Sequence, residues 1–123
     1  MLTIELEFPT GQVPQLEMLK DGKTYQLSQS LTIARALARK HGLTGDDEQE
    51  AALCDEVVDC INELTNLAVL AFMEQDSERK EKIKNRLQKE EYPRILGFLE
   101  RKLQGNGGKH MVGKNVSFLS FSQ

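Results

Sequence analysis

Few residues in this chain could form a metal centre, a disulfide framework or a histidine-based catalytic group. The two histidines, His41 and His110, stand far apart, so neither a metal-ligand cluster nor a Ser/His/Asp arrangement can be argued. The two cysteines, Cys54 and Cys60, fall in one predicted helix, about 240° apart around its axis, and therefore cannot bridge. We interpret both as buried, reduced thiols.

The chain also lacks a long apolar run and a charge bias of one sign. No stretch approaches the ~20 apolar residues of a membrane-spanning helix, and residues 1–5 do not resemble a secretory signal. We therefore expect a cytoplasmic protein with no membrane partner. The net charge of −3 and the pI near 5.4 give no reason to expect a nucleic-acid partner.

Strand patterns fill the first third of the chain. Alternating apolar and polar residues predict three strands, at residues 2–8, 15–19 and 24–27. Asp21-Gly22 is a strong hairpin-turn signal between the last two. A helix follows, with Ser30 as its predicted N-cap and Gly42 at its C-terminal end. The order β-β-β-α indicates a small α/β unit.

Only helical patterns follow the polar residues 44–47, which we interpret as a linker. One helix is predicted from Glu48 to about Gln75, and a second from its cap Ser77 to about Leu103. Pro93 should kink the second helix, because proline removes one helical hydrogen bond. The predicted domain organisation is residues 1–43, a linker at residues 44–47, and residues 48–123.

Several short motifs now carry a resemblance. They are Gly11-Gln12-Val13-Pro14, the run from Ser28 to Arg35, Glu50 to Asp55, Gly97 to Glu100, and Met111-Val112-Gly113. In order and spacing they resemble the cytosolic glutathione transferases, the sigma class best, over roughly residues 6–117. The resemblance implies a thioredoxin-like α/β N-terminal remnant followed by an incomplete all-α C-terminal domain. It also implies glutathione as a substrate and a small hydrophobic electrophile as its acceptor.

The resemblance assigns a glutathione-binding role to five residues. Pro14 would follow a cis bond, and Val13 would pair through its main chain with the cysteinyl residue of glutathione. Gln12 would contribute its amide, and Gln29 and Ser30 would hold the γ-glutamyl carboxylate at a helix N-terminus. Without the resemblance, Val13-Pro14 is simply a turn, and Gln29-Ser30 is simply a helix cap.

One further contact is implied across a homodimer. Members of the family place an acid from the partner subunit near the γ-glutamyl ammonium, and Glu63 stands at the matching position, where aspartate is commoner. Taken alone, Glu63 would be a solvated helix residue.

No residue of this chain matches the hydroxyl that activates the glutathione thiol in the family. The two tyrosines, Tyr25 and Tyr92, fall in the hairpin and in the last helix, so we assign no catalytic residue and no metal ligand. The chain therefore resembles a family member that is shortened at both ends. At the C-terminal end, Ser120 stands where an aspartate is expected after Ser117. We expect impaired conjugation. The alternatives are a non-catalytic glutathione-binding or dimerising module and a crystallin-like structural protein.

Overall fold

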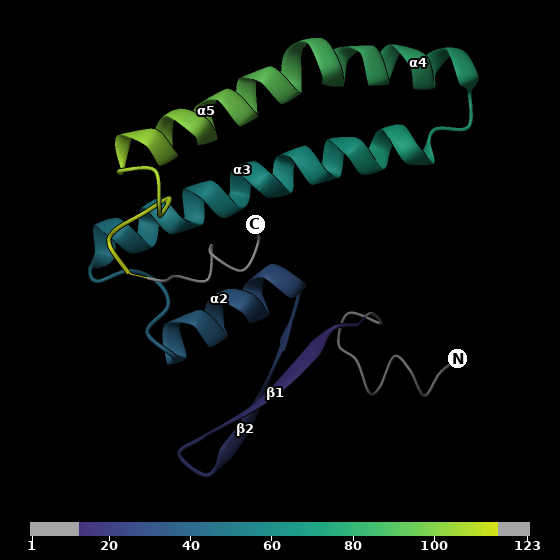
Figure 1. Ribbon diagram of the computed structural model, residues 1–123. Coiled ribbons are helices and arrows are strands. Elements are labelled where there is room, and N and C mark those ends of the chain that lie inside the picture. Colours follow the sequence, from purple (N-terminus) through teal and green to yellow (C-terminus); the bar gives the residue numbers. More distant parts are fainter. Residues whose placement is uncertain (1–12, 116–123) are drawn as a thin grey trace, which may run out of the picture. The chain divides into compact units, whose positions relative to one another are not determined.

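The computed structural model describes residues 13–115 and divides the chain into two compact units, Met1–Thr44 and Gly45–Gln123. The strand predicted at residues 2–8 lies outside the described residues. The first unit contains a β-hairpin and one helix, and the second contains helices alone (Figure 1). This order matches the predicted thioredoxin-like remnant followed by a helical domain.

The hairpin consists of β1 (Gln15–Lys20) and β2 (Lys23–Ser28), paired antiparallel. Its turn lies at Asp21 and Gly22, whose φ angles of 52° and 75° are both positive. Two positive φ values are the signature of a type I′ turn, whose twist suits the flanking strands. The prediction of a hairpin at Asp21-Gly22 is therefore confirmed.

Helix α2 spans Ser30–Lys40. The prediction that Ser30 caps it is wrong, because Gln29 is the N-cap and Ser30 is the first helical residue. Gln29 makes no capping hydrogen bond with its side chain. At the other end, Gly42 has a φ of 68°, the left-handed conformation predicted for a helix-ending glycine.

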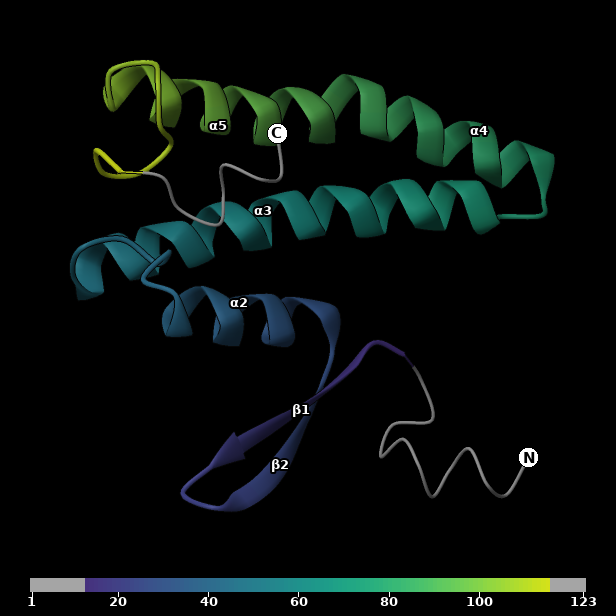
Figure 2. The same cartoon turned by 60° about the horizontal axis from the view of Figure 1, so that its bottom comes forward.

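The second unit is a helical hairpin. Its elements are α3 (Glu48–Met73), α4 (Ser77–Arg86), a π-helical turn η1 (Leu87–Glu91) and α5 (Tyr92–Gly105). Helix α3 runs antiparallel to the continuous path of α4, η1 and α5 (Figure 2). The prediction that Ser77 caps the second helix is wrong, because Asp76 accepts the main-chain N–H of Arg79 at 2.8 Å. Either residue type can cap a helix, and here the carboxylate has the correct register.

A π-helical turn, η1, comes just before Pro93, where a kink was predicted. Proline has no N–H to donate to the carbonyl four residues back, so the regular helical ladder cannot continue through it. Tyr92 instead donates its N–H to the carbonyl of Leu87, five residues back. The path of α5 then departs from the line of α4 (Figure 1).

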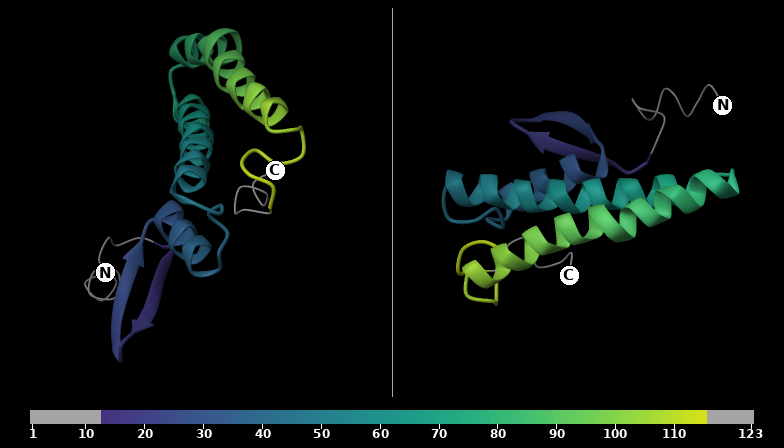
Figure 3. Two further views of the ribbon diagram at one scale, coloured as in Figure 1. Left: turned by 90° about the vertical axis from the view of Figure 1, so that its left-hand side faces the viewer. Right: turned by 90° about the horizontal axis from the view of Figure 1, so that it is seen from above.

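The main core lies in the second unit. Its most buried large side chains are Cys54 and Val57 on α3 and Ile95 on α5. After α5, the chain folds back toward the start of α3 (Figure 3), and Val112 joins the buried set. In the first unit, Ala38 is the only side chain in the described part that is fully buried. No helix within residues 13–115 is long and apolar enough to cross a membrane.

Candidate functional site

The register of the hairpin brings together the two segments that were predicted to bind glutathione. Gln15 at the start of β1 pairs with Ser28 at the end of β2. Val13-Pro14 comes directly before Gln15, and Gln29-Ser30 comes directly after Ser28. Paired residues of antiparallel strands lie about 4.5–5.5 Å apart, so the two segments leave the same end of the hairpin as neighbours.

The backbone at Val13 has the form that the resemblance implies. The Val13–Pro14 peptide bond is cis. The Val13 residue is 76% exposed, so a ligand can approach it from solvent. An exposed main-chain segment of this kind can pair with an extended peptide as an added strand does. Gln12, the remaining predicted residue of this run, lies outside the described residues.

The N-terminus of α2 offers main-chain donors at the same end of the hairpin. Its first described helical bond runs from the N–H of Ile33 to the carbonyl of Gln29, at 3.0 Å. The preceding N–H groups of a helix have no partner within it, and the helix dipole adds positive potential there. No acidic residue occupies the first turn. The arrangement therefore suits an anion such as a carboxylate.

Gln29 stands in a backbone conformation that non-glycine residues rarely adopt. Its φ is 75° and its ψ is 120°. Such a conformation costs roughly 1–3 kcal/mol and persists where the surrounding structure holds it, often at a ligand-binding position. Sequence patterns gave no sign of this, because glutamine has no preference for positive φ.

Gln15 is a functional candidate that the sequence reasoning missed. Its side-chain Oε1 atom is buried and accepts no hydrogen bond from the described part of the chain. A buried acceptor without a donor carries a cost of about 1–3 kcal/mol. Gln15 follows Pro14 directly, so the unpaired oxygen belongs to the same end of the hairpin. Only its position next to the Val13-Pro14 run could have drawn attention to it.

Glu63 lies on α3 in the helical unit, apart in the chain from the other predicted residues. Its Oε1 atom accepts a hydrogen bond from Nη2 of Arg94 at 2.5 Å. The same Nη2 atom lies 2.7 Å from Oε2 of Glu91. The hydrogen bond to Glu91, and to a smaller extent that to Glu63, raises the pKa of Arg94. The hydrogen bond from Arg94 in turn lowers the pKa of Glu91. Glu63 is thus ion-paired within its own chain, and its contact with a partner's ligand stays a prediction.

The two tyrosines occupy structural positions. Tyr25 faces Met18 across the hairpin and donates its hydroxyl to the Sδ atom at 3.2 Å. It therefore stands three residues along β2 from Ser28, the residue at the candidate site. Tyr92 belongs to α5, in the helical unit. The phenol of Tyr25 is thus engaged at mid-hairpin.

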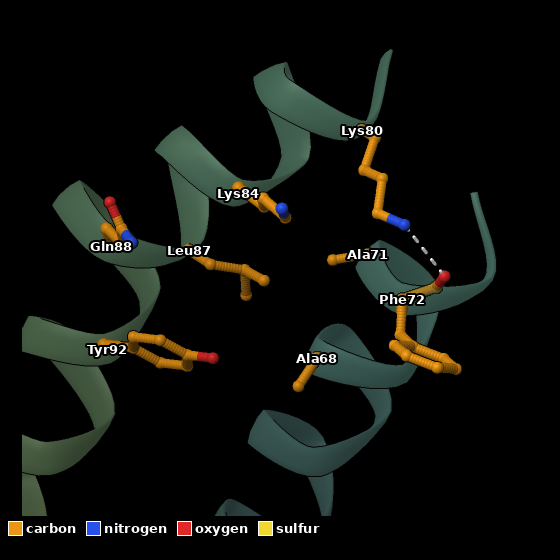
Figure 4. Close-up of a pocket in the computed structure, with 8 residues that line it drawn as sticks. All are labelled: Ala68, Ala71, Phe72, Lys80, Lys84, Leu87, Gln88 and Tyr92. Atoms are coloured by element: carbon orange, nitrogen blue, oxygen red, sulfur yellow. Dashed lines mark hydrogen bonds between the residues drawn. The ribbon is translucent and has the colours of Figure 1, made fainter. Parts of the chain in front are cut away.

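An open groove of about 430 Å³ lies between α3 and the α4–α5 path (Figure 4). Ala68 and Ala71 form one side, while Leu87 and Tyr92 point into the groove from the other (Figure 4). Lys80 borders it and donates from Nζ to the carbonyl of Phe72 at 3.3 Å. The floor is apolar, so the groove can hold an apolar group. No pattern in the sequence predicted this groove.

Neither Cys54 nor Cys60 is in a disulfide, as predicted, but only Cys54 is fully buried. The expectation of burial is wrong for Cys60, which is half-buried. Burial raises the pKa of the Cys60 thiol, and the nearby Glu56 and Glu63 carboxylates raise it further. A thiol with a raised pKa is a poor nucleophile at neutral pH. No three His, Cys, Asp or Glu side chains within residues 13–115 gather as metal ligands.

Comparison with known proteins defines the class to which this fold and hairpin site belong. A family model for the glutathione S-transferase C-terminal domain matches residues 62–122. The sigma class glutathione transferase of Fasciola hepatica superposes with a TM-score of 0.77 at 27% identity, over 95% of this chain and 56% of that one. A prostaglandin synthase D structure from Nilaparvata lugens gives 0.76 at 32% identity, over 98% and 62%.

Curated sequences agree with the structures. The chain is 39% identical to glutathione S-transferase 2 of Manduca sexta over 106 residues, which are 86% of this chain and 50% of that protein. It is 36% identical to hematopoietic prostaglandin D synthase of Gallus gallus over 118 residues, 96% of this chain and 55% of that protein. The chain belongs to the glutathione S-transferase family. It spans about half the length of the curated relatives it matches.

Proposed function

We propose that these 123 residues hold glutathione by its γ-glutamyl end and its main chain, without activating its thiol. The residues that bind are Gln12, Val13, Pro14, Gln29 and Ser30. The observation that carries the proposal is the register of the hairpin, which joins an exposed cis-proline segment to an uncapped helix N-terminus. Membership of the glutathione S-transferase family supports glutathione as the ligand.

Two chemical complementarities define the binding mode. The cysteinyl residue of glutathione pairs with the main chain of Val13 as a short added strand. The γ-glutamyl carboxylate lies at the start of α2, beside Gln29 and Ser30, where main-chain N–H groups and the helix dipole favour an anion. Main-chain recognition of this kind selects the peptide backbone and its charged end, and leaves the thiol free.

Activation of the thiol needs a group that these residues do not place at the site. A free thiol with a pKa of ~8.5 is only a few per cent ionised at neutral pH, and the thiolate is the nucleophile. A hydroxyl that donates to the sulfur would favour the thiolate, but Tyr25 donates to Met18 instead. For the whole protein we propose a cytoplasmic homodimer and conjugation of glutathione to an apolar electrophile, with the thiol activated by a group that these 123 residues do not supply.

The binding mode predicts opposite effects of one substitution on stability and on affinity. Thr32→Asp places a carboxylate in the first turn of α2, where it stabilises the helix by ~0.3–1 kcal/mol. The same carboxylate repels the γ-glutamyl carboxylate, so glutathione affinity should fall about tenfold or more by isothermal titration calorimetry. Thr32→Asn, which is neutral and nearly the same size, is the matched control and should bind as the native chain does.

Three results would contradict the proposal. Unchanged glutathione affinity in Thr32→Asp would show that the γ-glutamyl carboxylate does not lie at the N-terminus of α2. A folded native chain that fails to bind immobilised glutathione would favour the crystallin-like structural role. A conjugation rate with an aryl halide clearly above the uncatalysed rate would show that these 123 residues do activate the thiol.

A further inference from the structure

The loop that follows helix α5 contains an Asn-Gly pair, Asn106-Gly107. Helix α5 stops at Gly105, with Asn106 as its C-cap, and Gly107 follows with a φ of 91°. The N–H of Gly107 donates to the carbonyl of Gln104 at 3.1 Å, which closes the helix end. A glycine here is required by its positive φ. Asn106 is the only asparagine in the chain that precedes a glycine.

The side chain of Asn106 fastens the loop that follows it. Its Nδ2 atom donates to the carbonyl of His110 at 2.7 Å and to that of Gly113 at 2.8 Å. Both protons of one amide group are used, and both acceptors are main-chain oxygens. We call residues 106–113 the clasped loop, because this one side chain joins its beginning to its end.

The clasped loop lies against the start of α3. Gly113 approaches Glu50 so closely that an added Cβ would stand 2.8 Å from the Glu50 Oε2 atom. The same Oε2 atom accepts the N–H of Asp46 at 2.7 Å. Val112, beside Gly113, is only 5% exposed and belongs to the core. Opening the loop would therefore expose a core side chain and release the contact with α3.

We propose that Asn106 is a site of spontaneous deamidation, and that its conversion to a carboxylate releases the clasped loop. In this reaction the main-chain nitrogen of Gly107 loses its proton and attacks Cγ of Asn106. The new N–C bond closes a succinimide ring, and ammonia leaves with the side-chain nitrogen. Water then opens the ring at either carbonyl, which gives aspartate or isoaspartate. The glycine favours ring closure because it has no side chain to obstruct the attack.

The product cannot restore the clasp. A carboxylate has no proton to donate, and it would face the two carbonyl oxygens of His110 and Gly113 that the amide now satisfies. The Glu50 carboxylate beside Gly113 adds a like charge to the same region. Replacement of a double donor by an anion thus changes two attractions into repulsions. Isoaspartate also lengthens the main chain by one bond within the C-cap.

The closed loop itself slows the reaction. The N–H of Gly107 is hydrogen-bonded to Gln104, and the side-chain amide of Asn106 is hydrogen-bonded to the carbonyls of His110 and Gly113. The Gly107 nitrogen is therefore not positioned to attack Cγ of Asn106 while the clasp is closed. Asn106 is exposed, so water and hydroxide reach it whenever the loop opens. Deamidation therefore occurs from the open state, and its product keeps the loop open.

Tryptic cleavage after Lys109, which lies inside the clasped loop, measures loop opening. Asn106→Asp imitates the product, and Asn106→Ala removes the donors without adding a charge. Loss of these two hydrogen bonds predicts cleavage at least about tenfold faster in Asn106→Asp. Asn106→Ala should lie between this variant and the native chain. Asn85→Asp, which adds the same charge at an exposed position on α4, should be cleaved at the native rate.

Ageing the native chain in mildly alkaline buffer completes the test. Peptide mass spectrometry should find a gain of one mass unit at Asn106 ahead of the other asparagines, and the aged fraction should be cleaved as fast as Asn106→Asp. Cleavage of Asn106→Asp at the native rate would show that the Asn106 side chain does not hold the loop closed. An Asn106 that stays intact while other asparagines convert would overturn the modification site.

Discussion

Ile95 and Leu96 offer a direct test of which face of α5 stabilises the helical unit. They are adjacent on one helix and have side chains of equal size, but Ile95 is 2% exposed and Leu96 is 52% exposed. Substitution of each by alanine removes three carbon atoms and changes helix propensity little. The difference between the two variants therefore measures burial.

The expected size follows from the transfer of apolar groups out of water. Three buried carbon atoms at ~0.8 kcal/mol each give about 2.4 kcal/mol for Ile95→Ala. The cavity left behind raises the cost to roughly 3–4 kcal/mol, because the neighbouring side chains relax only partly. Leu96→Ala should change the free energy of unfolding by less than about 1 kcal/mol, since half of its surface already contacts water.

Urea unfolding followed by far-ultraviolet circular dichroism measures both variants, because the signal is dominated by the helices. With a slope of ~2 kcal/mol per molar urea, Ile95→Ala should lower the midpoint by roughly 1.5–2 M. Leu96→Ala should lower it by less than about 0.5 M. Equal midpoints for the two variants would refute the burial assignment, and so would a larger effect at Leu96.

Three further predictions concern caps and charges. Asp76→Ala should destabilise α4 by about 1 kcal/mol in thermal unfolding, whereas Ser77→Ala should have little effect, because the carboxylate of Asp76 accepts the capping bond. The hydrogen bond from Arg94 lowers the pKa of Glu91, so this pair stabilises the fold above pH 4.5 and is lost as the pH falls through the lowered value. Glu91→Gln should therefore weaken the dependence of Tm on pH in that acid range. Burial raises the pKa of Cys60, so its alkylation near pH 8 should accelerate on unfolding.

Local signals in the sequence located most of the fold. Asp21-Gly22 fixed the hairpin because few other residue pairs tolerate two positive φ angles. Gly42 ended α2 for a similar reason. The long apolar stripe after Glu48 predicted α3, which ends at Met73, two residues before the expected Gln75. Helix ends fray, so an error of this size is normal.

Sequence patterns failed where neighbouring residues compete for one role, and where the outcome depends on helix geometry or on how helices pack. Asp76 and Ser77 are both good caps, and only the three-dimensional register shows that Asp76 receives the N–H of Arg79. Pro93 predicted a kink, but not the π-helical turn that precedes it. Pairs such as Glu63 and Arg94, 31 residues apart, depend on how two helices pack, which no local pattern contains.

At Gln29 a failed local prediction coincides with the candidate site. A serine two residues after a strand should cap the helix, yet the chain places Gln29 in the cap at a φ of 75° and leaves the first turn without a side-chain acceptor. A sequence selected for stability alone would use a capping side chain and a relaxed backbone there. The first main-chain N–H groups of α2 lie at the hairpin end where Val13 is 76% exposed. We propose one common explanation for the strain and the missing cap, which is that a ligand's anionic group takes the place of the capping side chain.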